Sequence, residues 1–411
     1  MSEIIIPRDL GGEVFAPASK SYAHRMYICA ALSKEPSRIV CGNSCDDIMS
    51  TARCLESLGA RFDGDTVFPI DRSAIPDFPT LNCGESASTL RFLLPIVAAL
   101  GCGGKFELSD GLLKRPIDAL TEELSRHGVC FVDRKLHGKL NGNEFTIRGD
   151  ISSQFVSGLL MALPLMGGGI VNITSELQSA KYVDITIDCL RKAEIYVNRN
   201  GNSFEVSGKY ALSGTHVVEC DWSAAAFWLC AGAIGKYPVS VTGLNPTSLQ
   251  GDREIVNILR KFGASAEFAA DNSTVTVSPA PLHGVTIDAS QIPDLIPALS
   301  VVCAAANGES RIYNAGRLRG KESDRLRAIY VMLTALDADV TELPDGLIIR
   351  GGKKLRGGKV SSFSDHRIAM SAAITSSICD VEIEIDDFDC VKKSYPDFKR
   401  DLISLGGEIH E

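Results

Sequence analysis

The chain has 411 residues, of which 45% are hydrophobic and 23% charged, and its formal net charge is −9 with a pI near 5.4. This length and hydrophobic content predict a soluble globular protein with a large buried core and about two domains. The acidic balance argues against the sustained basic surface that nucleic acids and anionic membranes require, so any anionic ligand must be bound locally.

No targeting or cofactor signal stands out in the sequence. The N-terminal stretch MSEIIIPRDLGG has no basic region followed by a long apolar run, and no stretch without charges or breakers reaches the length of a membrane span. The 13 cysteines are scattered without a CxxC pair or a Cys/His ladder. No Walker loop, GxGxxG or GxSxG motif is present. We therefore expect a cytoplasmic protein with reduced, mostly buried cysteines, no metal and no organic cofactor.

Six segments recur along the chain at a nearly constant interval. Each reads as a helix C-terminus followed by an alternating strand. They are LESLGARFDG, LSRHGVCFVD, LRKAEIYVNR, LRKFGASAEF, LTALDADVTE and LISLGGEIHE, and their first leucines lie 69, 66, 69, 74 and 69 residues apart. The period predicts six copies of one structural unit.

A second series of six segments has the same period. Each has capping residues followed by mostly apolar positions, which is the pattern of a helix buried nearly all round. They are SKSYAHRMYICAALS, ESASTLRFLLPIVAAL, SSQFVSGLLMALPL, DWSAAAFWLCAGAI, PDLIPALSVVCAAA and SDHRIAMSAAITSS. Each unit should therefore combine one buried helix and one half-exposed helix with strands, in an α/β fold.

The chain ends suggest how the six units divide. The sixth unit stops one strand short of the others, and the N-terminal strand SEIIIP could fill that vacancy. We expect three units over 19–221 to form one domain, and 1–18 with 222–411 to form the second. The chain would then cross between the domains twice, and the equivalent helix N-termini of each domain would point the same way.

Basic residues collect where the predicted helices begin. In LRGKESDRLRA, Lys321 and Arg325 are like charges four residues apart at a helix N-terminus, an arrangement that costs a few tenths of a kcal/mol. Other helix openings carry Lys20, Arg25, Arg91, Lys114, Arg115, Lys181, Arg253, His366, Arg367, Lys392 and Lys393. We interpret these cations as a site for more than one phosphate or carboxylate. The alternative is ordinary solvated surface charge.

Two carboxylates and two polar motifs share these positions. Glu322 and Asp294 lie beside cations and could act as general acid or base, although Asp294 could also be only an N-cap. SSQF, from Ser152, and SAKY, from Ser179, offer hydroxyl and amide groups suited to a phosphorylated polyol, or ordinary caps.

The motifs SKSYAHR, KRP, SSQF, SAKYVDIT, IPD, KESDR, DHR and KKSYPD occur in the order found in 5-enolpyruvylshikimate-3-phosphate synthases, and the chain resembles that family from Lys20 to Pro396. The resemblance implies the inside-out α/β barrel of enolpyruvyl transferases: two similar domains of three βαβαββ repeats around a pseudo-threefold axis, with the active site in the cleft between them. It also implies transfer of the carboxyvinyl group of phosphoenolpyruvate to the 5-hydroxyl of shikimate 3-phosphate, with release of phosphate. These two substrates would be the partners of a monomer that binds neither nucleic acid nor membrane.

Carried over by position, the resemblance assigns site residues. Shikimate 3-phosphate would be bound by Ser21, Arg25, Ser152, Ser153, Gln154, Ser179, Tyr182, Asp294 and Lys321. Phosphoenolpyruvate would be bound by Lys20, Ala87, Arg115, Gln154, Arg325, Arg367 and Lys393. Asp294 and Glu322 would be the catalytic base and acid, with Lys20 a participant.

The chain departs from the family pattern at two places. ESASTLR has Glu85, Ala87 and Ser88 where many members have N-x-G-T, and the methyl of Ala87 should crowd out glyphosate while catalysis survives. Arg317 stands where an Asn often contacts the substrate, and its role stays open.

Two alternatives remain. A related transferase that uses UDP-N-acetylglucosamine shares the repeats, but it typically has Lys-Asn in place of Lys20-Ser21 and a reactive Cys in the loop that here reads SDGLLKRP. A non-catalytic binder of phosphorylated metabolites could share the fold, although it would not need both carboxylates.

Overall fold

The computed structural model describes residues 2–42, 44–270 and 272–410. The chain divides into two compact units, called here unit 1 (Met1–Pro17 and Glu219–Glu411) and unit 2 (Ala18–Val218). Unit 2 begins one residue before the domain expected over 19–221 and ends three residues before it. The N–H of Val218 donates to Val40 in unit 2, whereas the N–H of Asp221 donates to Pro17 in unit 1, so the chain changes unit between them.

Unit 2 contains three four-stranded sheets with one common strand order. In each sheet the first pair is parallel and the other two pairs are antiparallel. The sheets are β14 (Gly214–Val217), β3 (Ser37–Val40), β5 (Thr66–Phe68), β4 (Arg61–Asp63); β6 (Thr80–Gly84), β7 (Gly104–Leu108), β9 (Lys135–Gly138), β8 (Val129–Val132); and β10 (Glu144–Ile147), β11 (Gly169–Ile173), β13 (Ser203–Gly208), β12 (Ile195–Asn200).

Unit 1 repeats this arrangement three times. Its sheets are β2 (Gly12–Phe15), β15 (Val239–Thr242), β17 (Val275–Ser278), β16 (Ser265–Phe268); β18 (Thr286–Asp288), β19 (Gly308–Tyr313), β21 (Gly346–Gly351), β20 (Asp339–Leu343); and β22 (Gly358–Val360), β23 (Ile383–Ile385), β1 (Glu3–Ile6), β24 (Glu408–His410). Ile5 pairs antiparallel with Ile383 on one side and Ile409 on the other. The N-terminal strand therefore completes the sixth sheet, as predicted.

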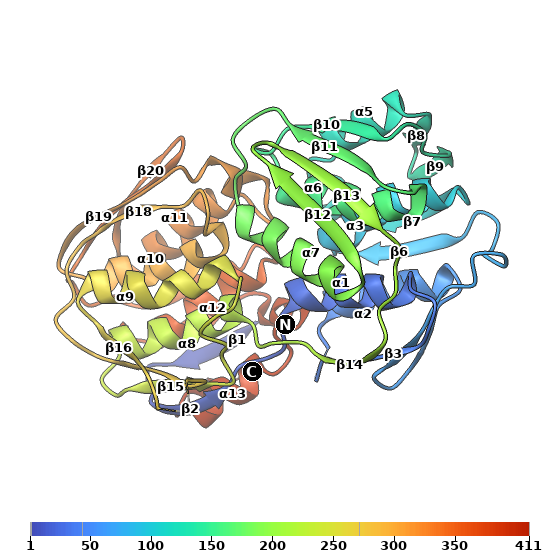
Figure 1. The fold of residues 1–411 in the computed structure, drawn as a ribbon. Helices are drawn as coiled ribbons and strands as arrows, with labels where there is room; N and C mark the ends of the chain where they lie inside the picture. The colour runs from blue at the N-terminus through green and yellow to red at the C-terminus, as the bar shows by residue number, and fades with distance from the viewer. Residues whose placement is uncertain (1, 43, 271, 411) are drawn as a thin grey trace. The chain divides into compact units, whose positions relative to one another are not determined.

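Two series of helices alternate with these strands and confirm the predicted repeat. The buried series is α1 (Lys20–Ala31), α3 (Ala87–Leu100), α6 (Ser153–Ala162), α8 (Trp222–Ile234), α10 (Ile296–Ala305) and α12 (His366–Ile374). The half-exposed series is α2 (Asp46–Ser57), α5 (Asp118–Arg126), α7 (Ala180–Lys192), α9 (Ile255–Phe262), α11 (Arg325–Ala335) and α13 (Phe398–Ser404). In unit 1, α8, α10 and α12 each contact the other two. Figure 1 shows the helices of unit 1 inside, with the sheets around them.

The chain turns sharply after each half-exposed helix, at a residue with left-handed backbone conformation. Four of the six positions are glycines, and Glu194 (φ 61°) and Asp337 (φ 69°) take the same conformation. A residue with a side chain in that conformation costs about 1 kcal/mol. All six repeats therefore keep this turn, including the two in which a residue other than glycine takes the left-handed conformation.

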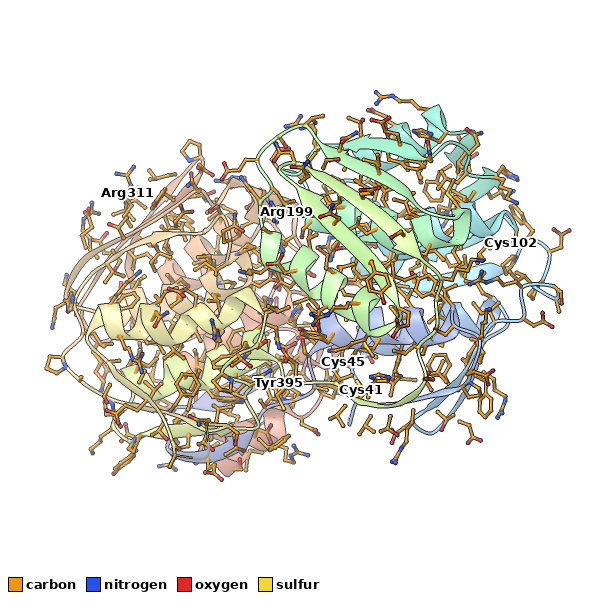
Figure 2. All side chains as sticks on the ribbon, viewed as in Figure 1. Cys41, Cys45, Cys102, Arg199, Arg311 and Tyr395 are labelled. Carbon is orange, nitrogen blue, oxygen red and sulfur yellow. The ribbon has the colours of Figure 1, made fainter. Side chains whose placement is uncertain are left out.

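Each unit has its own hydrophobic core. In unit 1 the indole N–H of Trp228 donates to the hydroxyl of Tyr395, which donates to Asp401, so the polar atoms of these two aromatic side chains are paired. Arg199 on β12 and Arg311 on β19 lie exposed on the outer faces of their sheets, and Figure 2 labels both with Tyr395.

All cysteines carry free thiols, and most are buried, as the scattered spacing predicts. Within the part of the chain that the structure describes, no helix is long and apolar enough to cross a membrane.

Candidate active site

A cluster of charged side chains in unit 1 forms around Asp294. Asp294 lies in the short helix η3 (Pro293–Leu295), directly before α10. Its Oδ1 accepts hydrogen bonds from Lys321 Nζ (3.1 Å) and Arg325 Nη1 (2.9 Å). Arg367 Nη1 donates to the backbone oxygen of Asp294 (3.0 Å), and Arg367 Nη2 lies 3.8 Å from Asp294 Oδ2. Three cations from two other helix openings therefore converge on one carboxylate.

Asp294 does not cap α10 with its side chain, and its predicted role as acid or base stays a prediction. Leu295 is the N-cap residue of α10, and that helix has no side-chain cap. The carboxylate is directed instead to Lys321 and Arg325. The local sequence P-D-L-I-P begins a helix with fixed proline geometry and leaves the Asp side chain available for contacts outside its own helix.

Arg325, the first residue of α11, is almost fully buried among carboxylates. Its Nε donates to Asp365 (2.8 Å), its Nη1 to Asp294 and its Nη2 to Glu322 (2.7 Å). The N-cap of α11 is Asp324, which accepts from the N–H of Arg327. The chain's own carboxylates already pair with Arg325, so this cationic helix opening does not by itself require a bound anion, and the assignment of Arg325 to phosphoenolpyruvate stays a prediction.

The outer cations of the same motif face away from this cluster. Arg319 and Arg327 both pair with Glu342, and Arg319 also pairs with Asp324. Lys181 pairs with Asp184 and Lys392 with Asp389 at exposed positions. For these side chains the alternative interpretation, solvated surface charge, holds.

The cluster shifts the proton affinity of its members. Burial raises the pKa of the Asp294 carboxyl, but Lys321, Arg367 and Arg325 outweigh burial and hold that pKa well below its usual range. Burial lowers the pKa of Lys321 to about 8, against the opposing charge of Asp294. Burial also disfavours charge on Arg325, yet the carboxylates of Asp365, Glu322 and Asp294 raise its pKa above the ordinary value. Asp294 is therefore an ionised acceptor at neutral pH.

Two further predicted residues of unit 1 are buried, one at a helix opening and one at a helix end. Arg367 is the second residue of α12, whose N-cap Asp365 accepts from its N–H (3.0 Å). Lys393 ends the short helix η6 (Phe388–Lys393), which contacts α12.

Lys20 is the first residue of α1 in unit 2. Its Nζ donates to Oδ2 of Asp47 (2.8 Å), and both side chains are mostly buried. Asp47 lies in the first turn of α2, where its negative charge is also favoured by the helix dipole. The pair joins the openings of two helices and fixes the position of the ammonium group.

Arg25 lies one turn further along α1 and is also buried. It donates to Thr186 Oγ1 (2.6 Å), to the backbone oxygens of Ser21 (2.6 Å) and Tyr182 (3.1 Å), and to Ser157 Oγ (3.3 Å). Burial lowers its pKa to about 10. Arg25 thus fastens Ser21 and Tyr182, two of the predicted ligand-binding residues, in one network.

Gln154 connects the openings of α6 and α3. Its amide nitrogen donates to Ser88 Oγ (2.8 Å) and its amide oxygen accepts from Arg91 (2.8 Å). Ser152 is the N-cap of α6 and accepts from the N–H of Gln154 (3.3 Å), so its hydroxyl does act as a cap. Ala87 is the buried first residue of α3.

The remaining predicted residues of unit 2 occupy nearby loops or helix openings. Ser153 is the buried first residue of α6. Ser179 is buried at the N-cap position of α7 with φ 53°, and its side chain makes no capping hydrogen bond. Arg91 donates to the backbone oxygen of Pro116 (2.8 Å), which brings the segment after Arg115 to α3.

Three carboxylates of these networks were not singled out in the sequence. Asp47 and Asp365 pair with Lys20 and Arg325, and Asp252 lies buried near Asp294 and Arg367. A signal existed for Asp365, because it stands in the predicted helix opening SDHR, where the neighbouring cations need counter-charges.

Comparison with solved structures identifies the architecture. The chain aligns over its whole length with an EPSP synthase from Acinetobacter baumannii at 22% identity, with full coverage of both chains and a TM-score of 0.81. It also aligns with the enolpyruvyl transferase NikO from Streptomyces tendae at 19% identity, covering 100% of this chain and 98% of that one, with a TM-score of 0.76. The fold is therefore that of the enolpyruvyl transferases, as predicted.

Sequence comparison narrows the class to one family. A profile of the EPSP synthase (3-phosphoshikimate 1-carboxyvinyltransferase) family matches residues 4–402. Proteins named 3-phosphoshikimate 1-carboxyvinyltransferase from Clostridium kluyveri and Clostridioides difficile are 42% and 41% identical, each over 99% of this chain and 98% of the relative. The chain belongs to the EPSP synthase family.

Proposed function

We propose that the protein transfers the enolpyruvyl group of phosphoenolpyruvate to the 5-hydroxyl of shikimate 3-phosphate and releases phosphate. Family membership defines the reaction class. The observation that carries the proposal is the cluster in which Asp294 accepts from Lys321 and Arg325 beside Glu322. It combines two carboxyl groups for proton transfer with cations that stabilise a phosphate-bearing intermediate.

The substrate assignments follow the family resemblance. We assign the phosphate, hydroxyl and carboxylate groups of shikimate 3-phosphate to Ser21, Arg25, Ser152, Ser153, Gln154, Ser179, Tyr182, Asp294 and Lys321. We assign phosphoenolpyruvate to Lys20, Ala87, Arg115, Gln154, Arg325, Arg367 and Lys393. These residues are divided between unit 1 and unit 2.

The reaction proceeds by addition and elimination. Asp294 takes the proton of the 5-hydroxyl of shikimate 3-phosphate. The hydroxyl oxygen bonds to C2 of phosphoenolpyruvate at the same time, and Glu322 or Lys20 protonates C3. The group that protonated C3 then takes a proton back from C3 of the tetrahedral intermediate as the C2–O bond to phosphate breaks, which restores the double bond and releases phosphate. Each well-placed cation near the phosphate can contribute several kcal/mol to the transition state.

The low pKa of Asp294 has a consequence for this mechanism. A carboxylate held by Lys321, Arg367 and Arg325 is a weak base. When the anions of phosphoenolpyruvate attract Arg325 and Arg367, part of this charge is withdrawn from Asp294 and its basicity rises. Substrate binding would thus activate the base at the moment when it is needed.

The direct test is phosphate release from the purified protein with phosphoenolpyruvate and either of two acceptors. The proposal predicts release with shikimate 3-phosphate and none with UDP-N-acetylglucosamine. Release with the sugar nucleotide would favour the related transferase. A folded protein that binds shikimate 3-phosphate without release would be a non-catalytic binder.

We also propose that Ala87 makes the enzyme insensitive to glyphosate. Ala87 is buried at the first position of α3, next to the N-cap Ser86 and to Ser88, which Gln154 contacts. Its methyl group occupies space that a glycine would leave open beside the phosphoenolpyruvate site. The compact substrate would still fit, and a longer inhibitor would not.

A further inference from the structure

Asp252 is a buried carboxyl group that the proposed mechanism does not use. It lies in the short helix η2 (Gly251–Glu254) before α9 and is 2% exposed. Ser223, in the first turn of α8, donates a hydrogen bond to its Oδ2. Its Oδ1 is buried, and no donor in the described ranges reaches that atom. A buried carboxylate oxygen without a donor is unfavourable, so this site accommodates a protonated carboxyl better than an ionised one.

The charged groups that face Asp252 come from three elements. They are Asp221 at the start of α8, Asp294 in η3 and Arg367 in α12. Helix α8 packs against both η2 and η3, and against α12. Burial and the charge of Asp294 raise the pKa of Asp252 to about 7, against the opposing charge of Arg367 and the Ser223 hydrogen bond. Arg367 is the only cation among these neighbours.

The charge of Arg367 therefore acts on both carboxyl groups, and Arg367 contacts Asp294 directly. It donates to the backbone oxygen of Asp294 and lies 3.8 Å from the Asp294 carboxylate. An anionic ligand that engages Arg367 withdraws positive charge from Asp252, which then binds a proton more tightly.

We propose that Asp252 is a positioning residue that takes up a proton from solvent when phosphoenolpyruvate engages Arg367. The cluster then gains the anionic ligand without accumulating an additional negative charge. This inference rests on the proposed function, in which Arg367 binds phosphoenolpyruvate.

The inference predicts a specific pH dependence. Asp252 is largely protonated below pH 7 before the substrate binds, whereas above pH 7 its negative charge opposes the binding of a further anion at Arg367. The KM for phosphoenolpyruvate should therefore rise about tenfold from pH 6.5 to pH 8.5, as expected for one linked proton with a pKa near 7. Because the substrate phosphate itself titrates near pH 6, each variant is compared with the wild type at each pH.

Asp252→Asn is the principal variant. Its amide oxygen still accepts from Ser223, its amide group stays neutral, and it imitates the protonated carboxyl. We expect its KM for phosphoenolpyruvate to match the wild type at pH 6.5, to be about tenfold lower than the wild type at pH 8.5, and its kcat to change less than twofold. Asp401→Asn, another buried carboxyl in unit 1 that pairs with Tyr395, is the matched control and should keep the wild-type profile.

Ser223→Ala provides a second test if Asp252→Asn does not fold. Removal of the hydroxyl donor disfavours the carboxylate, so the rise in KM should move to higher pH. If Asp252→Asn keeps the wild-type dependence of KM on pH, the inference is overturned. The same result in Ser223→Ala has this meaning if Asp252→Asn is unfolded. An equal loss of kcat at every pH would also overturn it. Absence of turnover in the wild type would instead refute the proposed function.

Discussion

Arg25 in unit 2 and Arg325 in unit 1 are both almost fully buried, but their guanidinium groups have different kinds of hydrogen-bond acceptor. Arg25 donates only to hydroxyl and backbone oxygens among the described residues, and its pKa falls to about 10 through burial. Arg325 is surrounded by three carboxylates, which raise its pKa despite burial.

This difference in acceptors indicates two different roles for a buried arginine. A guanidinium satisfied by neutral groups keeps its positive charge available to the surroundings and favours a bound phosphate or carboxylate. A guanidinium among carboxylates leaves little net charge, but it fixes the geometry of groups that exchange protons. We infer that Arg25 retains more uncompensated positive charge than Arg325, and that Arg325 mainly fixes the positions of Asp294 and Glu322.

The largest effect should come from the two proposed acid and base groups of unit 1. Asp294→Asn and Glu322→Gln should each lower kcat by about 10²–10⁴-fold, because each removes one proton-transfer group. Saturating phosphate-release assays measure the loss. Glu342→Gln, which removes a carboxylate that pairs with Arg319 and Arg327 outside the cluster, is the control and should retain activity. A loss below tenfold in both test variants would contradict the assignment.

The next effect compares the two arginines directly. Arg325→Met leaves Asp294, Glu322 and Asp365 without their common cation and should lower the free energy of unfolding by about 3–5 kcal/mol. Arg25→Met leaves only neutral groups unpaired and should cost about 1–3 kcal/mol.

Denaturant titrations can assign these losses to the units. Both tryptophans, Trp222 and Trp228, lie in unit 1, so their fluorescence reports on that unit, whereas circular dichroism reports on both. Equal losses in the free energy of unfolding would show that removing a cation costs the same beside neutral partners as beside carboxylates, and would contradict the predicted difference.

A smaller effect concerns the pH dependence of unit 2. Burial, with Lys20 and Arg25, lowers the pKa of His24 to about 3 against the opposing charge of Asp47. The unfolded chain binds a proton at this histidine below pH 6.5 while the folded chain does not, so stability falls as pH falls from 6.5 toward 3. Between pH 6.5 and 5 the loss should be about 2 kcal/mol.

His24→Gln should remove this part of the pH dependence, and His216→Gln, at a partly exposed position, should not. Unfolding followed by circular dichroism at several pH values measures both. A pH dependence that persists in His24→Gln would rule out the buried neutral histidine as its source.

The smallest effect concerns inhibitor selectivity at α3. Ala87→Gly removes one methyl group and should strengthen glyphosate inhibition by about tenfold, a typical value for one methyl in a tight site. The KM for phosphoenolpyruvate should change little. The measurement is the inhibition constant of glyphosate for the wild type and for Ala87→Gly. Equal constants would show that Ala87 does not determine the sensitivity to glyphosate.

Much of the fold could be predicted because the repeat is visible in the sequence itself. The spacing of the leucines located the half-exposed helices, and the missing last strand led to the pairing of Ile5 between Ile383 and Ile409. The candidate residues at helix openings were found in the same way.

The partners of those residues could not be predicted. A cation at a helix opening has the same sequence pattern whether its counter-charge is a ligand or a carboxylate of the chain. Arg325 meets Asp365 forty residues away, and Lys20 meets Asp47 twenty-seven residues away. Periodicity gives the position of a side chain in its repeat, but it does not determine which side chains of neighbouring repeats touch.

The most direct test of the account is to run the reaction in heavy water with phosphoenolpyruvate and shikimate 3-phosphate, and to analyse the product by mass spectrometry. Addition converts C3 of phosphoenolpyruvate into a methyl group that carries one solvent-derived hydrogen, and elimination removes one of its three hydrogens. The account therefore predicts deuterium in the methylene group of the enolpyruvyl product. An enolpyruvyl product without deuterium would contradict the addition–elimination mechanism and the proton transfers assigned to unit 1.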